Sequence, residues 1–89
     1  MDNTRQISAI MFTDMQGYTT LMQENEQHAM AVRAKHRELF DTTTEKFKGS
    51  IIQYFGDGTL SVFKSSVEAV HCAIEMQLAF IANKIPVRI

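Results

Sequence analysis

Two aspartates in this sequence stand at the ends of segments with strand-like composition. Asp14 follows the almost continuously apolar residues 7–13, and Asp57 lies in a short glycine-rich stretch between two β-rich segments. If the first strand pairs with that hairpin, both carboxylates reach the same edge of an antiparallel sheet. Two converging carboxylates form a hard oxygen site suited to Mg²⁺ or Mn²⁺. Two such ions can bridge the phosphates of a substrate and activate a hydroxyl for in-line attack.

The residues that follow Asp14 add a candidate phosphate site. The stretch 16–20, Gln-Gly-Tyr-Thr-Thr, is typical of a loop that opens a short helix. Backbone amides at a glycine-opened helix start can hold phosphates, and the helix dipole favours anions there. Each aspartate alone has a simpler interpretation, as turn chemistry for Asp57 or as a strand end or helix cap for Asp14. The three features together favour a site for a metal ion and a phosphate.

A defined order of elements must position these groups. The pattern predicts a strand covered on both faces, a short helix, a long helix, a β-hairpin, a second long helix and the start of another strand. These elements lie at 7–13, just after Asp14, from Asn25 to Gly49, at 50–55 with 59–63, from Ser65 to Asn83, and at 87–89. The order is typical of a ferredoxin-like, split βαβ arrangement, an α+β fold whose antiparallel sheet has helices on one face. Because the sequence stops inside the expected last strand, we expect the natural domain to continue and this chain to be truncated.

Both long helices carry an apolar stripe at helical spacing. In the first helix, charged residues such as Arg33 and Arg37 are interpreted as the solvated face, and the stripe consists of Val32, His36, Leu39 or Phe40, Thr43 and Phe47. In the second helix, the stripe consists of Val67, Val70, Ile74, Leu78 and Ile81. Ser65, three residues before Glu68, is a capping-box candidate for the start of the second helix.

Composition excludes several classes of protein. Apolar residues make up 45% of the 89 residues and the formal net charge is -1, so we expect an ordered domain without a nucleic-acid or anionic-membrane partner. There is no long apolar run for a membrane span, and the single cysteine, Cys72, cannot pair within the chain, so we expect a cytoplasmic location. Cys72 is predicted to be a buried, inert thiol. His28, His36 and His71 lack the spacing of a zinc site.

Three blocks of sequence carry a resemblance to a known family. FTDMQGYTTL begins at Phe12, FGDGTLSVF begins at Phe55, and AVHCAIEMQ begins at Ala69. In order and spacing these blocks resemble the catalytic domain of class III adenylyl and guanylyl cyclases, and the resemblance covers essentially residues 1–89 as the N-terminal part of that domain. It implies formation of a 3′,5′-cyclic nucleotide and pyrophosphate from ATP or GTP with two Mg²⁺ or Mn²⁺ ions.

The resemblance also implies roles for individual residues. Asp14 and Asp57 would be the metal-binding carboxylates, and the backbone carbonyl of Met15 would be a further ligand. The amides that face the β- and γ-phosphates would be those of Gly17, Tyr18 and Thr19. In the family, one ion lowers the pKa of the ribose 3′-hydroxyl that attacks the α-phosphorus, and the other neutralises the departing pyrophosphate.

Gln53 departs from the family pattern at a position that contacts the base. Many adenylyl cyclases have a lysine there, four residues before the hairpin aspartate, that contacts adenine. Glutamine can donate and accept hydrogen bonds to a base edge, so Gln53 is a base-recognition candidate, with a solvent-facing strand residue as the plain alternative. We expect cAMP rather than cGMP as the product. The second base-contacting residue and the family's transition-state asparagine and arginine lie beyond this chain, and Asn83 and Arg88 match neither motif.

Two consequences and two alternatives follow from the resemblance. Family sites form across a head-to-tail dimer, so we expect a homodimer and expect this chain alone to be inactive. One alternative is a catalytically silent cyclase-like module that serves dimerisation or regulation. The other is the related fold of diguanylate cyclases, which also pairs a strand-end aspartate with a hairpin acid, although FGDG lacks their extended acidic hairpin signature.

Overall fold

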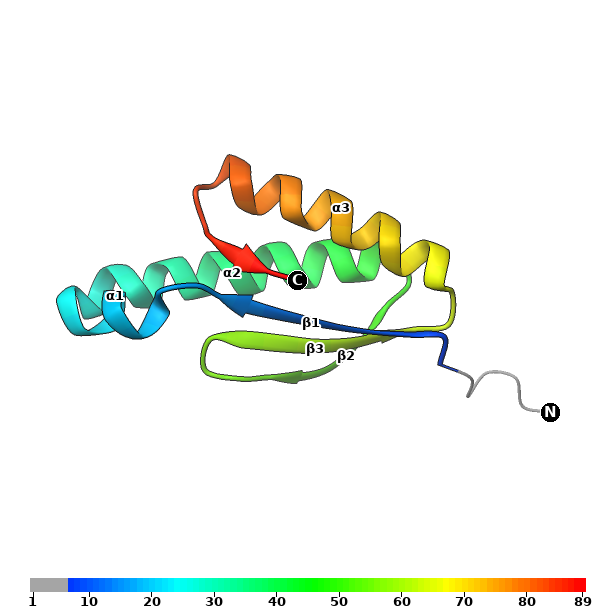
Figure 1. Ribbon diagram of the computed structural model, residues 1–89, viewed down its shortest axis with the longest axis horizontal. Helices are drawn as coiled ribbons and strands as arrows, with labels where there is room; N and C mark the ends of the chain where they lie inside the picture. Colours follow the sequence, from blue (N-terminus) through cyan, green and yellow to red (C-terminus); the bar gives the residue numbers. More distant parts are fainter. Residues whose placement is uncertain (1–6) are drawn as a thin grey trace.

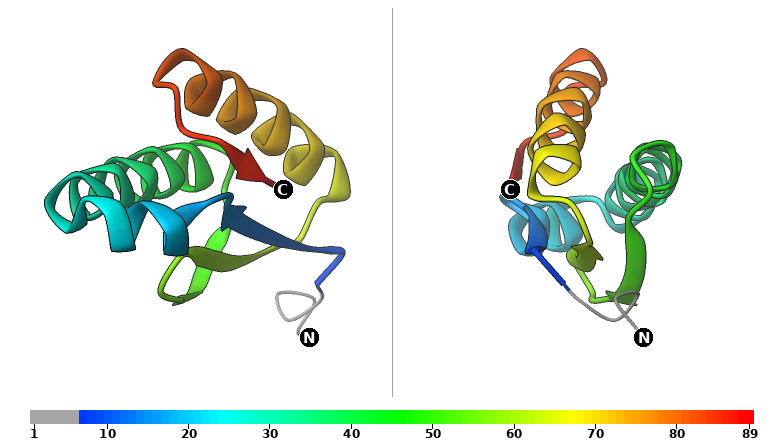
Figure 2. Two further views of the ribbon diagram at one scale, coloured as in Figure 1. Left: turned by 60° about the vertical axis from the view of Figure 1, so that its left-hand side comes forward. Right: turned by 90° about the vertical axis from the view of Figure 1, so that its right-hand side faces the viewer.

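A four-stranded antiparallel sheet carries three helices in the computed structural model, which describes residues 7–89 (Figure 1). The elements in chain order are β1 (Ala9–Met15), α1 (Tyr18–Glu24), α2 (Glu26–Lys46), β2 (Ser50–Tyr54), β3 (Gly58–Phe63), α3 (Ser66–Ala82) and β4 (Val87–Arg88). The strand order is β2-β3-β1-β4, and α2 and α3 lie on the same face of the sheet (Figures 1 and 2). This arrangement confirms the ferredoxin-like prediction.

The strand β1 is covered on one face only, which corrects the prediction of a strand buried on both. Met11, Thr13 and Met15 point toward the helices and are buried, whereas Ile10 and Phe12 are 62% and 59% exposed. Side chains alternate between the two faces of a strand, and α1, α2 and α3 leave the outer face of this sheet uncovered. The apolar run at residues 7–13 therefore includes both buried residues of the inner face and exposed residues of the outer face.

The strand β1 also extends further than the sequence indicated. It runs to Met15 rather than to residue 13, so Asp14 lies within the strand, opposite Gly58 of β3. The backbones approach closely at this point, because a Cβ atom on Gly58 would overlap the carbonyl oxygen of Thr13. Beyond this pair, the Met15 amide donates to the carbonyl of Asp57 at 2.7 Å. The hairpin and the end of β1 are therefore locked together by backbone contacts.

The helix α2 begins and ends with local capping interactions. The side chain of Asn25 accepts a hydrogen bond from the amide of His28 at 3.1 Å, as expected at a helix N-cap. At the other end the left-handed residue is Lys48, with φ of 64°, and not Gly49. Gly49 serves packing instead, since a Cβ there would overlap the ring of Phe63.

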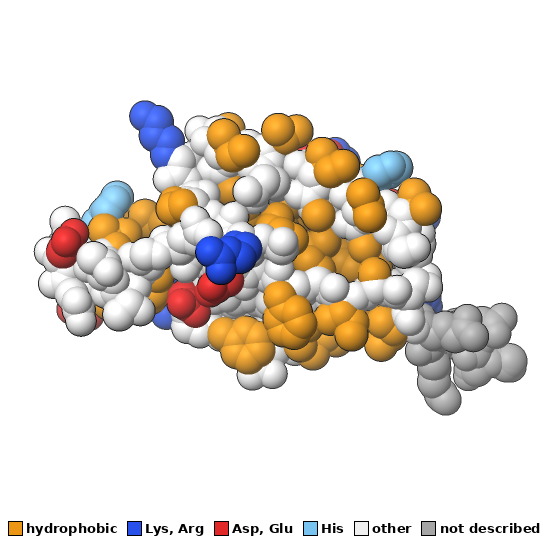
Figure 3. Space-filling view, in the orientation of Figure 1, with side chains coloured by type: hydrophobic (Ala, Val, Ile, Leu, Met, Phe, Trp, Pro, Cys, Tyr) orange, Lys and Arg blue, Asp and Glu red, His pale blue; other side chains and the backbone are white. Residues whose placement is uncertain are grey.

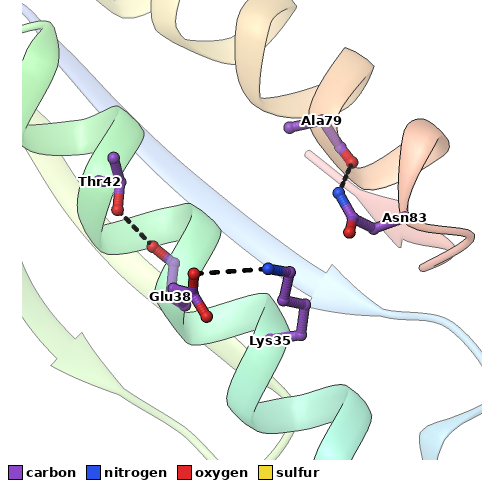
Figure 4. A network of polar contacts seen from close by, with 5 residues as sticks. All are labelled: Lys35, Glu38, Thr42, Ala79 and Asn83. Carbon is purple, nitrogen blue, oxygen red and sulfur yellow. Dashed lines mark hydrogen bonds and ion pairs between the residues drawn. The ribbon is translucent and has the colours of Figure 1, made fainter.

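The buried side of α2 agrees with the predicted stripe. His36, Phe40 and Thr43 are buried, and the other apolar members of the stripe pack against the core. On the solvent side, Lys35 pairs with Glu38 at 3.4 Å, and Thr42 donates to the Glu38 carbonyl (Figure 4). This helix is therefore amphipathic in the ordinary way.

The apolar stripe of α3 faces solvent in the structure. The residues that face the core are Ala69, Cys72, Met76 and Phe80. The stripe residues are each 56% to 63% exposed: Val67, Val70, Ile74, Leu78 and Ile81. Figure 3 shows these exposed hydrophobic side chains along the upper helix, with a second group along the sheet below. The helix thus has apolar residues on two faces, and the branched aliphatic ones are on the outer face.

Both ends of α3 agree with the sequence. Ser65 accepts a hydrogen bond from the amide of Glu68 at 3.1 Å, which confirms Ser65 as the N-cap and one of the two bonds of the predicted capping box. The helix ends at Ala82, and the side chain of Asn83 donates to the carbonyl of Ala79 at 2.8 Å (Figure 4). Within residues 7–89, no helix is both long enough and apolar enough to cross a membrane.

The close approach at Gly58 generates a stability prediction. Gly58→Ala should lower the free energy of unfolding by about 1–3 kcal/mol, because the added methyl group must push β1 away from β3. Urea denaturation of the two proteins measures the difference. Gly56→Ala is the matched control, since a Cβ at Gly56 meets no atom within 4 Å and should change stability by less than about 0.5 kcal/mol. Equal effects of the two substitutions would contradict the packing argument.

Candidate functional site

A pocket of about 500 Å³ lies where the end of β1 meets the β2–β3 hairpin. Its lining contains both aspartates, the loop that follows β1 and one arginine from β4. The lining residues are Asp14, Met15, Gln16, Gly17, Tyr18, Thr19, Thr20, Asp57 and Arg88. The structure therefore brings together every site residue predicted from the sequence except Gln53.

Backbone pairing on both sides of β1 places Asp14 at the centre of this pocket. On one side Asp14 is opposite Gly58, directly after Asp57, and on the other it is opposite Arg88 of β4. The amide of Gln16 donates to the carbonyl of Pro86 at 2.9 Å, which extends the pairing with the segment before β4. Asp14 is exposed and Asp57 is half-buried, so both carboxylates are accessible to a ligand.

The loop after β1 has the backbone geometry that its glycine allows. Gly17 adopts a left-handed conformation, with φ of 75°, and forms the N-cap of α1 without a side-chain capping bond. Amides in the first turn of a helix have no acceptor within the helix, so those of Tyr18 and Thr19 are free of helical partners. Thr19 and Thr20 are exposed at the pocket, whereas the ring of Tyr18 is buried.

Two arginines of α2 contact the hairpin that carries Asp57. Arg37 donates from Nη2 to the carbonyl of Phe55 at 3.1 Å, and Arg33 donates from Nη1 to the carbonyl of Gly56 at 3.5 Å. The guanidinium carbon of Arg37 also lies 4.7 Å from the centre of the Tyr54 ring, within cation–π range. The interpretation of Arg33 and Arg37 as part of a merely solvated face was therefore wrong, because sequence spacing does not show that the hairpin folds back against this helix.

Tyr54 connects the same hairpin to α2 through a side-chain hydrogen bond. Its hydroxyl donates to the Asp41 carboxylate, and this bond raises the pKa of Tyr54 above its usual value, with a smaller contribution from burial. The ring packs edge-on against Phe40 at 6.1 Å. The hairpin tip is thus held by α2 on its inner side.

Gln53 lies outside the pocket, on the outer face of the sheet. A β-bulge at Ile52 separates the pairs Ile51–Ser61 and Gln53–Leu60, so Gln53 is opposite Leu60, which is opposite Phe12. Asp14 is the next outward residue of β1 after Phe12. Gln53 therefore shares the outer face with Asp14 but lies two strands away from it, in the row of Leu60 and Phe12.

Arg88 is the pocket residue that the sequence analysis did not assign. With its side-chain amide turned so that the oxygen faces Arg88, Gln16 can accept hydrogen bonds from Nε of Arg88 at 3.2 Å and from Nη2 at 3.0 Å. This contact holds the guanidinium at the pocket beside two carboxylates. The sequence contained one indication of this position, the alternation of apolar and charged residues at 87–89. In a strand with Val87 buried, Arg88 points to the opposite, outer face.

A polar network lies on the inner side of the same strands. Nε2 of the buried His36 is 3.0 Å from Oγ1 of Thr13, and the hydroxyls of Thr13 and Thr59 are hydrogen-bonded to one another. Burial, with a smaller contribution from the neighbouring Arg37, lowers the pKa of His36 to about 4, against the opposing charges of Asp57 and Asp14. The imidazole is therefore neutral at pH 7.

The remaining titratable candidates have no catalytic surroundings. Burial raises the pKa of Cys72 to about 11, and its thiol donates to the carbonyl of Thr43 at 3.7 Å, which confirms an inert buried thiol. His28 and His71 are exposed and far apart in the sequence. Among the described residues, no three His, Cys, Asp or Glu side chains come together as a metal site.

The donor set of the pocket fits a hard divalent cation. Asp14 and Asp57 offer carboxylate oxygens, Met15 is a further lining residue, and the lining residues include no cysteine or histidine. Mg²⁺ and Mn²⁺ prefer such all-oxygen sites and take their other ligands from substrate phosphates and water. The arrangement suits an ion that is held jointly by protein and ligand.

Comparison with known proteins agrees with this geometry. The sequence model of the family described as "Adenylate and Guanylate cyclase catalytic domain" matches residues 1–88, so the chain belongs to this family of nucleotidyl cyclase catalytic domains. The chain is 34% identical over 80 residues to "Putative adenylate cyclase 3" of Rhizobium meliloti (strain 1021), covering 88% of this chain and 14% of that protein. It is 34% identical over 70 residues to "Serine/threonine-protein kinase pkn2" of Myxococcus xanthus, covering 76% of this chain and 8% of that protein.

Solved cyclase structures share the fold. An adenylate cyclase from Trypanosoma brucei, described in its monomeric state, superposes with a TM-score of 0.78 at 25% identity, over 89% of this chain and 36% of that one. The guanylyl cyclase Cya2 superposes with a TM-score of 0.74 at 26% identity, over 82% of this chain and 41% of that one. The chain thus spans well under half of the solved cyclase chains and a small part of the curated relatives it matches.

The lowered pKa of His36 generates a pH prediction. Between about pH 4 and 6.5 the unfolded chain binds a proton on His36 that the folded chain does not, so the free energy of unfolding should rise with pH over this window. Urea denaturation at several pH values measures the slope. His36→Gln removes the titrating group but leaves the carboxylates that titrate nearby, so its slope should be smaller. Equal slopes in the two proteins would show that His36 is not kept neutral by the fold.

Proposed function

We propose that this chain forms the metal- and phosphate-binding part of a class III nucleotidyl cyclase. The parent domain would convert ATP or GTP, with cAMP favoured over cGMP, into the 3′,5′-cyclic nucleotide and pyrophosphate with two Mg²⁺ or Mn²⁺ ions. The single observation that carries this proposal is the backbone bond from Met15 to Asp57, which fixes two strand-end carboxylates in one pocket with the residue 16–20 loop.

Each pocket residue has a role in this proposal. The bound ions would supply the acidity for the 3′-hydroxyl and charge neutralisation for pyrophosphate. Asp14 and Asp57, with the Met15 carbonyl, would hold those ions, and the triphosphate would bind to the amides of Gly17, Tyr18 and Thr19. Arg88 adds positive charge at the same pocket, which favours an anionic ligand. The protein then acts by positioning and by electrostatic stabilisation rather than by covalent chemistry.

The base-binding part of the site would come from a second subunit. Gln53 lies on the outer face away from the pocket, and we propose that it contacts the base of a nucleotide held by a second subunit, in a cytoplasmic homodimer. This assignment is consistent with the exposed apolar residues Ile10 and Phe12 on that face. The 89-residue chain alone should therefore bind metal but not turn over nucleotide.

A silent dimerisation or regulatory module is the second candidate function. The observation that favours it is the exposed apolar surface of α3 and of the outer sheet face, which is typical of an interaction surface. The two candidates differ in whether the aspartates act on a nucleotide. Metal binding and product formation separate them.

Metal binding is the first test of the pocket. The chain should bind Mn²⁺, measured by electron paramagnetic resonance of the free ion, and Asp14→Asn or Asp57→Asn should weaken binding by more than the roughly 10- to 100-fold typical of changes outside the ligand shell. Asp41→Asn is the matched control, because that carboxylate binds Tyr54 on the far side of the hairpin. Loss of binding in the control alone, or in none of the variants, would place the ion elsewhere.

Product formation tests the reaction itself. The longest reading frame that contains this sequence should convert Mn²⁺-ATP into a 3′,5′-cyclic product that co-elutes with authentic cAMP on chromatography, and more slowly convert Mn²⁺-GTP into cGMP. Asp57→Ala should abolish both products, while Asp41→Asn should retain them. A folded, dimeric protein without cyclic product would favour the silent module. The 89-residue chain assayed alongside should give no product.

A further inference from the structure

A buried histidine connects the long helix α2 to the two strands that carry the aspartates. His36 is 1% exposed, its ring packs against Phe80 of α3 at 5.2 Å, and Nε2 lies 3.0 Å from Oγ1 of Thr13. Thr13 is hydrogen-bonded in turn to Thr59, its direct partner across β1 and β3. One side-chain network therefore joins α2, β1 and β3.

Close packing of the core does not require polar side chains at the positions of this network. Thr13 and Thr59 are 3% and 0% exposed, and the buried cluster of the core is mostly apolar, with several Phe, Met and Ala side chains. Polar groups in such surroundings lose their hydration, and they are tolerated only when they bond to each other. An apolar side chain at the position of His36 could fill the same space without that requirement.

The place of the network in the strands gives it a consequence for the pocket. Thr13 immediately precedes Asp14, and Thr59 is separated from Asp57 only by Gly58. The pair Thr13–Thr59 is the last inward-facing pair before the pair Asp14–Gly58 and the Met15–Asp57 backbone bond. The two hydroxyls thus join β1 and β3 at the residue pair next to Asp14 and Gly58.

We propose that His36 is a positioning residue: through Thr13 and Thr59 it fixes the spacing of the strand ends that carry Asp14 and Asp57. The importance of that spacing for metal binding rests on the proposed cyclase function. The spacing itself does not, because it is set by contacts within the described chain. Since outer contacts orient the ligands of a metal, loss of this one should weaken the site without removing a ligand.

The experiment separates positioning from general stability. Amide hydrogen exchange of the 89-residue chain, measured by NMR, reports the Met15–Asp57 backbone bond through the Met15 amide and the helix interior through the Phe40 amide. His36→Leu and Thr13→Val remove the network in two ways, and the second keeps the β-branched shape. His36→Gln restores a side-chain amide able to bond to Thr13. Met76→Ala is the control, a buried core truncation of α3 outside the network.

Selective loss of protection at Met15 is the expected result. In His36→Leu and Thr13→Val, exchange at Met15 should accelerate more than exchange at Phe40, and His36→Gln should return it toward the wild-type ratio. Met76→Ala should accelerate both amides alike, by general destabilisation. If the His36 and Thr13 variants also accelerate both alike, or if His36→Gln gives no rescue, the residue is a core residue only and the proposal is overturned. Should His36→Leu fail to fold, Thr13→Val decides the outcome by the same ratio.

Mn²⁺ affinity then separates this proposal from the proposed function. His36→Leu and Thr13→Val should weaken Mn²⁺ binding about 10-fold, less than Asp14→Asn, while Met76→Ala leaves it unchanged. If Asp14→Asn and Asp57→Asn do not affect Mn²⁺ binding, the metal site of the proposed function is wrong, and the Met15 exchange ratio still decides the role of His36. If the aspartates matter but the network variants bind Mn²⁺ normally, the proposed function survives and the positioning of the carboxylates by His36 is overturned.

Discussion

The close approach of β1 to the hairpin at Thr13 and Gly58 is the constraint on which the site depends. The space there admits only a glycine, and the Met15–Asp57 hydrogen bond forms directly beyond it. Two backbone contacts therefore determine where two carboxylates lie, without any interaction between the carboxylates themselves. In the proposed function, a cation bound at these two carboxylates would offset the repulsion between their like charges.

Side chains alternate between the two faces of the sheet along β1 and β3, and the two faces have different roles. Inward residues such as Thr13 and Met15 join the helices, and outward residues such as Asp14 face the pocket or solvent. The helix α2 contacts the strands inside the core, through the buried His36, and contacts the hairpin backbone at the surface, through Arg37. The hairpin that carries Asp57 is thus held from inside the core and at its tip.

Much of this arrangement could be predicted from the sequence because local signals agreed with the global fold. The order of elements and the cap at Ser65 rested on short-range patterns, and the meeting of both aspartates followed from the strand pairing that this order implies. The failures concerned information that periodicity does not contain. An apolar run does not say which faces are covered, as β1 and the outer stripe of α3 both show. The role of Arg88 depends on pairing with β1, which only the sheet order reveals.

The β-bulge at Ile52 has a consequence for how such a domain can diverge. A single extra residue moves every later side chain of a strand to the opposite face of the sheet. Ile51, before the bulge, therefore faces the core, and Gln53, after it, faces outward. Substitutions at the outward position leave the inner layer of the hairpin untouched. If Gln53 contacts the base as proposed, the end of β2 is a place where nucleotide selectivity would change over evolutionary time while Asp14 and Asp57 keep their positions.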